Sequence, residues 1–224
     1  MPPWAQISKN RAMSSTNHAQ AERAELCDLF LEVGPSAPTL CEGWTTRDLA
    51  AHLVVRDRRP DAAVGILVPR FSGHTDKLQA AEAAKPWEQL VDLVRTGPPA
   101  LSPVHFGAID KAFNTIEFFV HHEDVRRAQD DWTPRELDPD LELVLWQTIS
   151  RMSKMALRKA PCGVVLALPG GSKVTAKKAE PSVEITGPAG EIVLFTNGRQ
   201  EHAEVTLSGP TEAADALRAA KFGF

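Results

Sequence analysis

Apolar positions along the first two thirds of the chain recur every three or four residues, the spacing of an amphipathic helix. The pattern predicts helices over residues 18–33, 45–66, 73–96, 108–129 and 138–160. Prolines interrupt two of these segments: Pro60 is expected to end or kink the second, and Pro86 to split the third into two short helices. Thr45, followed three residues later by Asp48, is close to a capping box and marks the start of the second helix. The fourth segment is apolar around most of its girth, so we expect it to be the most buried.

Beyond Pro161 the pattern changes to short β-rich runs separated by glycine and proline turns. The runs that predict strands are residues 164–168, 183–186, 192–195 and 205–207, with a further strand position at Val174. Residues 211–220 return to helical spacing and are expected to close the chain as a helix. We therefore predict an α+β protein, with a four-helix bundle over residues 16–160 followed by a small α/β domain over residues 161–224.

The composition indicates which partners and which cellular compartment to expect. A formal net charge of -4 over 224 residues gives no general attraction to nucleic acid or to a membrane surface. No uninterrupted apolar stretch approaches the ~18 residues that span a bilayer. Cys27, Cys41 and Cys162 are odd in number and widely spaced, as expected for reduced thiols in the cytoplasm. Residues 1–15 are expected to be a disordered extension, and Met13 is an alternative start.

Two helical segments carry imidazoles and a carboxylate among apolar residues. Glu117 and His121 are four residues apart, so on a helix they share a face with Cβ atoms roughly 6 Å apart. His52, between two leucines on the second helix, is the third candidate; alone it would more often be a histidine that hydrogen-bonds across the bundle. Two histidines and a carboxylate suffice to bind zinc with one coordination position open. His122 is five residues from Glu117 and is expected to turn away.

Three polar residues near these faces are candidates for orienting the ligands. Asp48 lies four residues before His52, and Asn114 and Asp124 lie three residues outside Glu117 and His121. Carboxylates and amides in such places hydrogen-bond metal-binding histidines and fix their orientation. The alternative for Asn114 and Asp124 is an ordinary ladder of ion pairs along the helix.

Arg56, four residues after His52, is a candidate for binding a substrate carboxylate. Arg58 and Arg126 are possible helpers. The alternative, which is the commoner role for any single arginine, is pairing with a nearby aspartate at the surface.

The spacing differs from the HExxH pattern of metallopeptidases, in which a glutamate inside the motif is the general base. Here Glu117 takes the place of a ligand, which leaves no evident base. Such a site suits a substrate or cofactor that brings its own nucleophile, and a thiol is the natural candidate because metal coordination deprotonates it.

The stretches 44–53 and 117–124 resemble the mycothiol-dependent maleylpyruvate isomerase family and its wider DinB-like (YfiT-like) relatives. Residues 118–128 look like a subgroup of uncharacterised actinobacterial metal-binding proteins within it. The resemblance implies a four-helix bundle that binds zinc through His52, Glu117 and His121, and mycothiol as a cofactor. Residues 183–187 and 190–199 resemble the small α/β domain, similar to sterol carrier folds, that follows the bundle in this family. The segment is short for a lipid tunnel, which suggests a lid or wall beside the metal.

Three functions follow as hypotheses. The first is a zinc- and thiol-dependent transferase or isomerase, in which the sulfur attacks an electrophilic small molecule. The second is a metal-dependent hydrolase, which the missing base weakens. The third is a non-catalytic protein that binds metal or a small molecule. Cys41 is not expected to complete a closed structural site, because eleven residues of helix would place it roughly 16 Å from His52.

Overall fold

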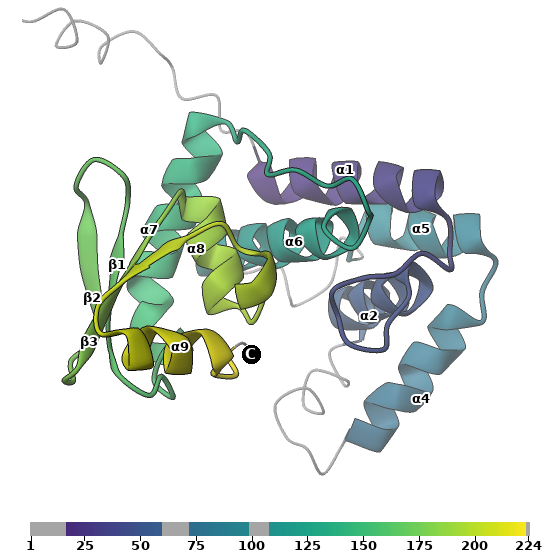
Figure 1. Ribbon diagram of the computed structural model, residues 1–224. Coiled ribbons are helices and arrows are strands. Elements are labelled where there is room, and N and C mark those ends of the chain that lie inside the picture. The colour runs from purple at the N-terminus through teal and green to yellow at the C-terminus, as the bar shows by residue number, and fades with distance from the viewer. Residues whose placement is uncertain (1–16, 60–71, 99–107, 223–224) are drawn as a thin grey trace, which may run out of the picture.

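The computed structural model describes residues 17–59, 72–98 and 108–222, with side chains described from residue 75 in the second range and from residue 112 in the third. Figure 1 shows a group of helices on one side and a small sheet with its own helices on the other. The elements of the first part are α1 (His18–Val33), α2 (Thr46–Arg58), α4 (Ser72–Ala83), α5 (Trp87–Thr96), α6 (Ala108–Arg126) and α7 (Pro139–Ala156).

Local signals set the ends of several of these helices. The side chain of Asn17 caps α1 at its start, and Gly34, with φ +80°, ends it. The capping box at Thr45 begins α2, which ends at Arg58, before Pro60. The predicted continuation over residues 60–66 lies outside the described residues. The split at Pro86 is confirmed, whereas α6 and α7 end three or more residues earlier than predicted.

The first hydrophobic core lies between α1, α2, α5 and α6. Its fully buried members include Phe30 of α1, Leu53 of α2, Leu90 of α5 and Phe118 of α6. The helix α1 runs alongside α6, and α5 packs against both α1 and α2, as Figure 1 shows. This arrangement brings α2 and α6 close enough to share a site.

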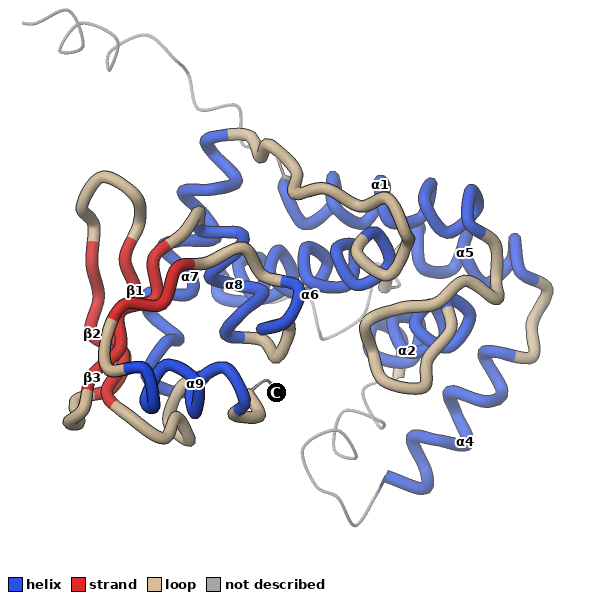
Figure 2. The backbone as a smooth tube through the Cα atoms, viewed as in Figure 1, coloured by secondary structure: helices blue, strands red, loops and turns tan. Residues whose placement is uncertain are grey.

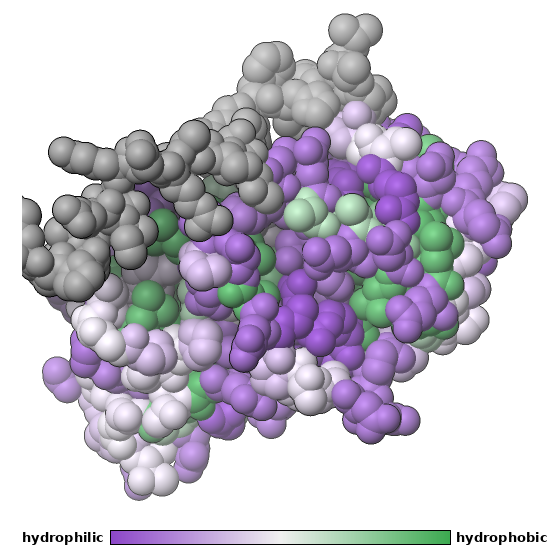
Figure 3. All heavy atoms as spheres, turned by 90° about the horizontal axis from the view of Figure 1, so that it is seen from above, coloured by the Kyte–Doolittle hydropathy of each residue, from purple (hydrophilic) through white to green (hydrophobic). Residues whose placement is uncertain are grey.

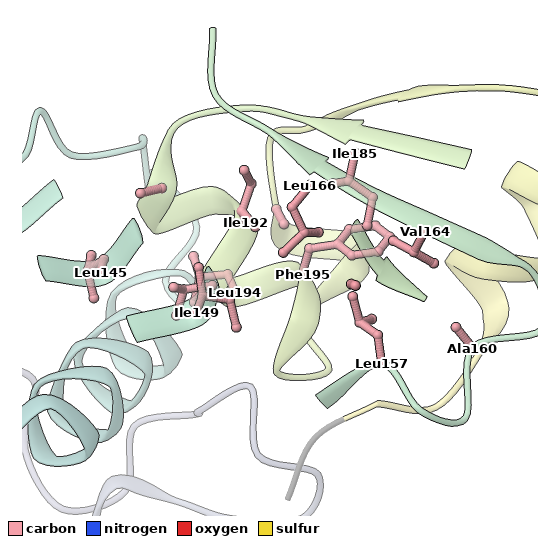
Figure 4. Packing of buried hydrophobic residues seen from close by; sticks show 14 of the residues in the cluster. Leu145, Ile149, Leu157, Ala160, Val164, Leu166, Ile185, Ile192, Leu194 and Phe195 are labelled. Carbon is pink, nitrogen blue, oxygen red and sulfur yellow. The ribbon is translucent and has the colours of Figure 1, made fainter. Parts of the chain in front are cut away.

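The second core lies between α7, the sheet and the buried helix α8 (Ala189–Thr196). Figure 4 shows Leu145 and Ile149 of α7 beside Leu194, and Phe195 beside the strand residues Val164 and Leu166. The helix α7 therefore packs mainly against the carboxy-terminal elements. The helix α7 also contacts α6 in this core. The four-helix bundle and the boundary near Pro161 stay predictions.

The described strands form a mixed sheet in the order β2-β1-β3-β4 (red in Figure 2). Their bounds are β1 Gly163–Ala167, β2 Lys173–Lys177, β3 Ser182–Thr186 and β4 Thr206–Ser208, with α9 at Thr211–Ala219 closing the unit. β1 pairs with β2 antiparallel and with β3 parallel, and the connection from β3 to the antiparallel β4 contains α8.

One predicted strand is wrong. Residues 192–195 belong to α8, and every residue of this helix is buried. A segment that is buried on all sides shows no helical periodicity, so its β-branched residues suggested a strand. Pro188 and the Glu142 carboxylate, which accepts a hydrogen bond from the Ala189 amide at 2.7 Å, define the start of the helix. The α+β class is confirmed.

Among the described helices, none combines the length and the apolar character needed to cross a membrane. The face seen in Figure 3 is mostly hydrophilic, with small separate hydrophobic patches.

Candidate metal centre

Two helices bring the three predicted ligands together. His52 comes from α2, and Glu117 and His121 come from successive turns of α6. Oε1 of Glu117 lies 3.3 Å from Nε2 of His121 and 3.8 Å from Nε2 of His52. One ligand atom from each residue lies within 4.8 Å of the other two, so a single cation between them could reach all three.

The charges at the trio are strongly coupled. Burial would raise the pKa of Glu117, but hydrogen bonds from His121 and His52 hold it well below its usual value. Burial lowers the pKa of His52. For His121 burial also acts to lower the pKa, yet contacts with Asp124, Cys41 and Glu117 raise it well above the ordinary value. A divalent cation would take the place of the His121 proton as the counter-charge of Glu117.

Glu117 is the most exposed side chain of the trio. The Glu117 side chain is 31% exposed, compared with 19% for His52 and 11% for His121. The indole of Trp44 lies against His52, with ring centroids 5.1 Å apart. A small molecule would therefore approach from the side of Glu117, with Trp44 shielding His52.

Asp124 supports His121 from behind. Its Oδ2 lies 2.9 Å from Nδ1 of His121, which directs the Nε2 atom toward Glu117 and His52. Burial would raise the pKa of Asp124, but hydrogen bonds from His121 and Arg199 lower it to about 2. A carboxylate in this place keeps the Nδ1 proton on the ring and leaves Nε2 as the metal-binding nitrogen. The role predicted for Asp124 stays a prediction, and this contact supports it.

Asp124 has two further partners that the sequence did not indicate. Arg199, from the segment after α8, donates from Nε to Oδ1 at 2.7 Å and from a terminal nitrogen to Oδ2 at 2.6 Å. The Cys41 thiol donates to Oδ2 at 3.2 Å.

The expectation that Cys41 lies far from the site is wrong. It belongs to the loop before α2, so the rise of a helix does not apply, and it lies with His121 and Asp124 in a second group of potential ligands. Because Arg199 already occupies the carboxylate of that group, Cys41 is placed to support Asp124.

Arg56 and Asn114 lie on the other side of Glu117. Nε of Arg56 is 3.2 Å from Oε1 of Glu117, and a terminal nitrogen donates to Oδ1 of Asn114 at 2.6 Å. A further contact at 3.0 Å joins Arg56 to Asp57. Asn114 therefore reaches the trio through Arg56.

The remaining predicted residues lie elsewhere. Asp48 was expected to orient a ligand, but its carboxylate accepts hydrogen bonds from the amide and the hydroxyl of Thr45, so it caps α2. The expected helpers also have other partners, since Arg58 bonds Thr96 and Arg126 bonds Glu123. The Asp48 carboxylate is engaged with the N-cap residue Thr45 in the capping box, which explains why it does not turn toward His52.

A third group of potential ligands, Glu22, Glu25 and His122, lies against α1. As predicted, His122 turns away from the trio: its Nδ1 is 2.9 Å from a carboxylate oxygen of Glu22. The guanidinium of Arg135 contacts both carboxylates of this group, at 2.9 Å for Glu22 and 3.3 Å for Glu25. The positive charge of Arg135 therefore already neutralises the carboxylates of this group.

A cavity of about 110 Å³ lies on the side of α6 opposite the trio, lined by Phe119, Glu123, Arg127 and neighbouring residues of α8. Ion pairs join four of its charged side chains, those of Glu123, Arg127, Arg135 and Glu191. The trio therefore carries the candidate chemistry, because its imidazole and carboxylate donors suit a borderline divalent cation such as zinc.

No family model matches the sequence, and no curated protein matches it. Solved structures do match. The crystal structure of the mycothiol-dependent maleylpyruvate isomerase superposes with a TM-score of 0.58 at 15% identity, over 86% of this chain and 90% of that one. A mutant of the same enzyme gives a TM-score of 0.57 at the same identity and coverage.

The chain has the fold of this isomerase. At 15% identity the likeness concerns the fold alone. It agrees with the resemblance seen in residues 44–53 and 117–124 at the level of the fold. The roles of individual residues have to be argued from the geometry of the trio.

Proposed function

We propose that the protein is a metal-dependent enzyme of the thiol-using transferase or isomerase class, with His52, Glu117 and His121 as ligands of a divalent cation, zinc in the first place. The observation that carries this proposal is the meeting of two imidazole nitrogens and a carboxylate oxygen within 4.8 Å, from two helices. The fold shared with an enzyme named for its dependence on mycothiol supports a small thiol as the second reactant.

Two features prepare the trio for a cation. Glu117 provides the negative charge, and Asp124 holds the proton of His121 on Nδ1 so that the Nε2 lone pair is available. Three protein ligands leave a coordination position for an exogenous group. A cation bound there would hold a low-molecular-weight thiol such as mycothiol as its thiolate, the nucleophile for an electrophilic carbon.

Arg56 is the proposed contact for a substrate carboxylate. Within the described residues three of its five N–H groups are engaged, with Glu117, Asp57 and Asn114. The positive charge lies beside Glu117, the most exposed side chain of the trio. An anionic electrophile bound there would be held next to the position proposed for the thiol.

The first experiment is a measurement of bound metal followed by substitution with cobalt. Addition of mycothiol or a simpler thiol to the cobalt protein is expected to produce a thiolate-to-metal charge-transfer band, and the His52→Ala protein is expected to show neither bound cobalt nor the band. His122→Ala is the matched control, because His122 lies on α6 next to the proposed ligand His121 but faces Glu22.

The other hypotheses give different results in the same assay. Metal binding without the thiol band, together with esterase or amidase activity, would favour the hydrolase. Metal binding with neither would favour a binding protein. A wild-type protein that retains no divalent cation after loading would refute the proposed centre.

A further inference from the structure

Two buried ion pairs connect α6 with the carboxy-terminal part of the chain. Arg127, the residue directly after α6, pairs with Glu191 of α8 through two contacts, at 2.6 and 2.9 Å. Asp124, one turn earlier on α6, pairs with Arg199 through two contacts at 2.7 and 2.6 Å. Both pairs are bidentate, and together they hold the region from α8 to residue 199 against the helix that carries two of the proposed ligands.

Only one of these pairs reaches the trio. The Oδ2 atom of Asp124 accepts from Arg199 and lies 2.9 Å from Nδ1 of His121, so one carboxylate oxygen joins the carboxy-terminal region to a proposed ligand. The Arg127–Glu191 pair is instead shared with Glu123, on the opposite side of α6. The two ion pairs are thus similar, but only Asp124–Arg199 contacts a proposed metal ligand.

The Asp124 carboxylate is compensated by Arg199 through two hydrogen bonds, in addition to its contacts with His121 and the Cys41 thiol. Its side chain is completely buried, and an ionised carboxylate in such a place needs compensating donors. Arg199 is in turn held in place, because its other terminal nitrogen donates to the backbone carbonyl of Asn197. Without the guanidinium, Asp124 would lose two of its charged hydrogen bonds and would hold the ring of His121 less firmly.

We infer that Arg199 is a positioning residue for the metal centre, and that its bidentate contact with Asp124 sets the metal affinity of His121. This inference rests on the proposed function, since it needs the trio to bind a cation. It assigns to the region after α8 a task inside the site, although Arg199 does not contact the trio directly. By thermodynamic linkage, metal bound at the trio would in turn stabilise the segment around Arg199.

The test compares Arg199→Gln with Glu191→Gln, measuring zinc affinity by competition with a chromophoric chelator and thermal stability of the metal-free proteins. Arg199→Gln is expected to weaken zinc binding by about 10- to 100-fold, the range for residues that orient metal ligands. Glu191→Gln, which weakens the other ion pair, is expected to lower stability and to change zinc affinity by less than about threefold. Arg199→Lys, which keeps the charge without the bidentate geometry, should lie between wild type and Arg199→Gln.

A second readout does not depend on metal. The ¹⁵N chemical shifts of His121 in the metal-free protein report which ring nitrogen carries the proton, and Arg199→Gln is expected to change them while Glu191→Gln is not. Hydrogen exchange in residues 197–203 is expected to slow when zinc is added to the wild type. Both measurements remain informative in Arg199→Lys if Arg199→Gln proves too unstable to purify.

The outcomes separate this inference from the proposed function. If wild type binds no zinc, the proposed centre itself fails. If wild type binds zinc and Arg199→Gln and Arg199→Lys bind it equally well, the positioning role is overturned and the centre stands. If Glu191→Gln weakens zinc as much as Arg199→Gln does, the effect belongs to docking in general and the specific role of Arg199 is overturned.

Discussion

The neighbouring histidines of α6 stand in two contrasting environments. His121 faces α2, where it meets His52 and Glu117, and His122 faces α1, where it meets Glu22 and Glu25. Each environment offers three potential ligands within reach of a single cation. At His122, however, the guanidinium of Arg135 contacts Glu22, Glu25 and also Glu123 at 2.7 Å, and it lies over the Phe119 ring.

The difference teaches that proximity of ligand atoms does not define a metal site. At His122 the arginine supplies the positive charge, with four hydrogen bonds to two glutamates of α1 and one of α6. At the trio, Arg56 makes a single 3.2 Å contact with Glu117 and divides its other donors between Asp57 and Asn114. The cluster at His122 is a structural ion-pair network whose carboxylates are occupied by Arg135. The trio leaves its potential ligands less occupied.

The largest expected effect on stability comes from removing Arg135 from the cluster at His122. Arg135→Gln leaves the buried carboxylates of Glu22 and Glu123 without their shared cation, so we expect a loss of about 3 kcal/mol in the free energy of unfolding. Urea denaturation of the metal-free protein measures it. The same variant should bind a second equivalent of zinc at the freed ligands, and a stoichiometry unchanged from wild type would contradict this interpretation of the cluster.

Removing a ligand tests the trio. His52→Ala is expected to weaken zinc binding by at least about 100-fold, because the loss of a direct ligand should exceed the effect of a residue that only orients one. His122→Ala should leave zinc affinity within about threefold of wild type while lowering stability. Chelator competition and thermal melting give both quantities, and equal losses of affinity in the two variants would remove the distinction between the histidines.

The ion pairs around Arg135 should make the stability of the protein depend on pH. Burial acts to raise the pKa values of Glu22 and Glu123, but His122 and Arg135 at Glu22, and Arg135 with Arg127 at Glu123, lower both. Their contribution to stability is therefore fully present above the ordinary carboxylate pKa of 4.5 and is lost as the pH falls through the lowered folded values. Unfolding free energies measured from pH 6 to pH 3 should fall less steeply in Arg135→Gln than in wild type; parallel curves would argue against this assignment.

The smallest effect is expected at Asp48. Because its carboxylate caps α2, Asp48→Ala should cost about 1 kcal/mol of stability and leave zinc affinity unchanged. A marked loss of zinc binding in this variant would restore the role that the sequence suggested for Asp48.

Sequence reasoning worked where a signal is local. Periodicity and caps placed α1, α2 and the Pro86 break, and a four-residue step placed Glu117 and His121 on one face. It failed at α8, because a helix buried on every side has no polar face to show its period. His52 could be paired with them only through the family resemblance and a general preference for two histidines and a carboxylate.

Contacts between segments far apart in the sequence could not be predicted either. Arg135 and Arg199 reach α6 from loops, and Cys41 lies in a turn before α2, so no spacing in the sequence connects them with their partners. A buried Glu or Asp on an apolar helix is the one signal that could have indicated them, since such a charge needs a cation from elsewhere in the chain.

Adjacent aromatic residues of α6 face the two hydrophobic cores. Phe118 belongs to the core with α1, α2 and α5, and Phe119 to the core with α7 and α8. Neither core can therefore lose its packing without disturbing the backbone that supports the other. Melting followed by the circular dichroism of the helices and by tryptophan emission should show one shared transition, and a chain cut between the two parts would leave each with an incomplete interior.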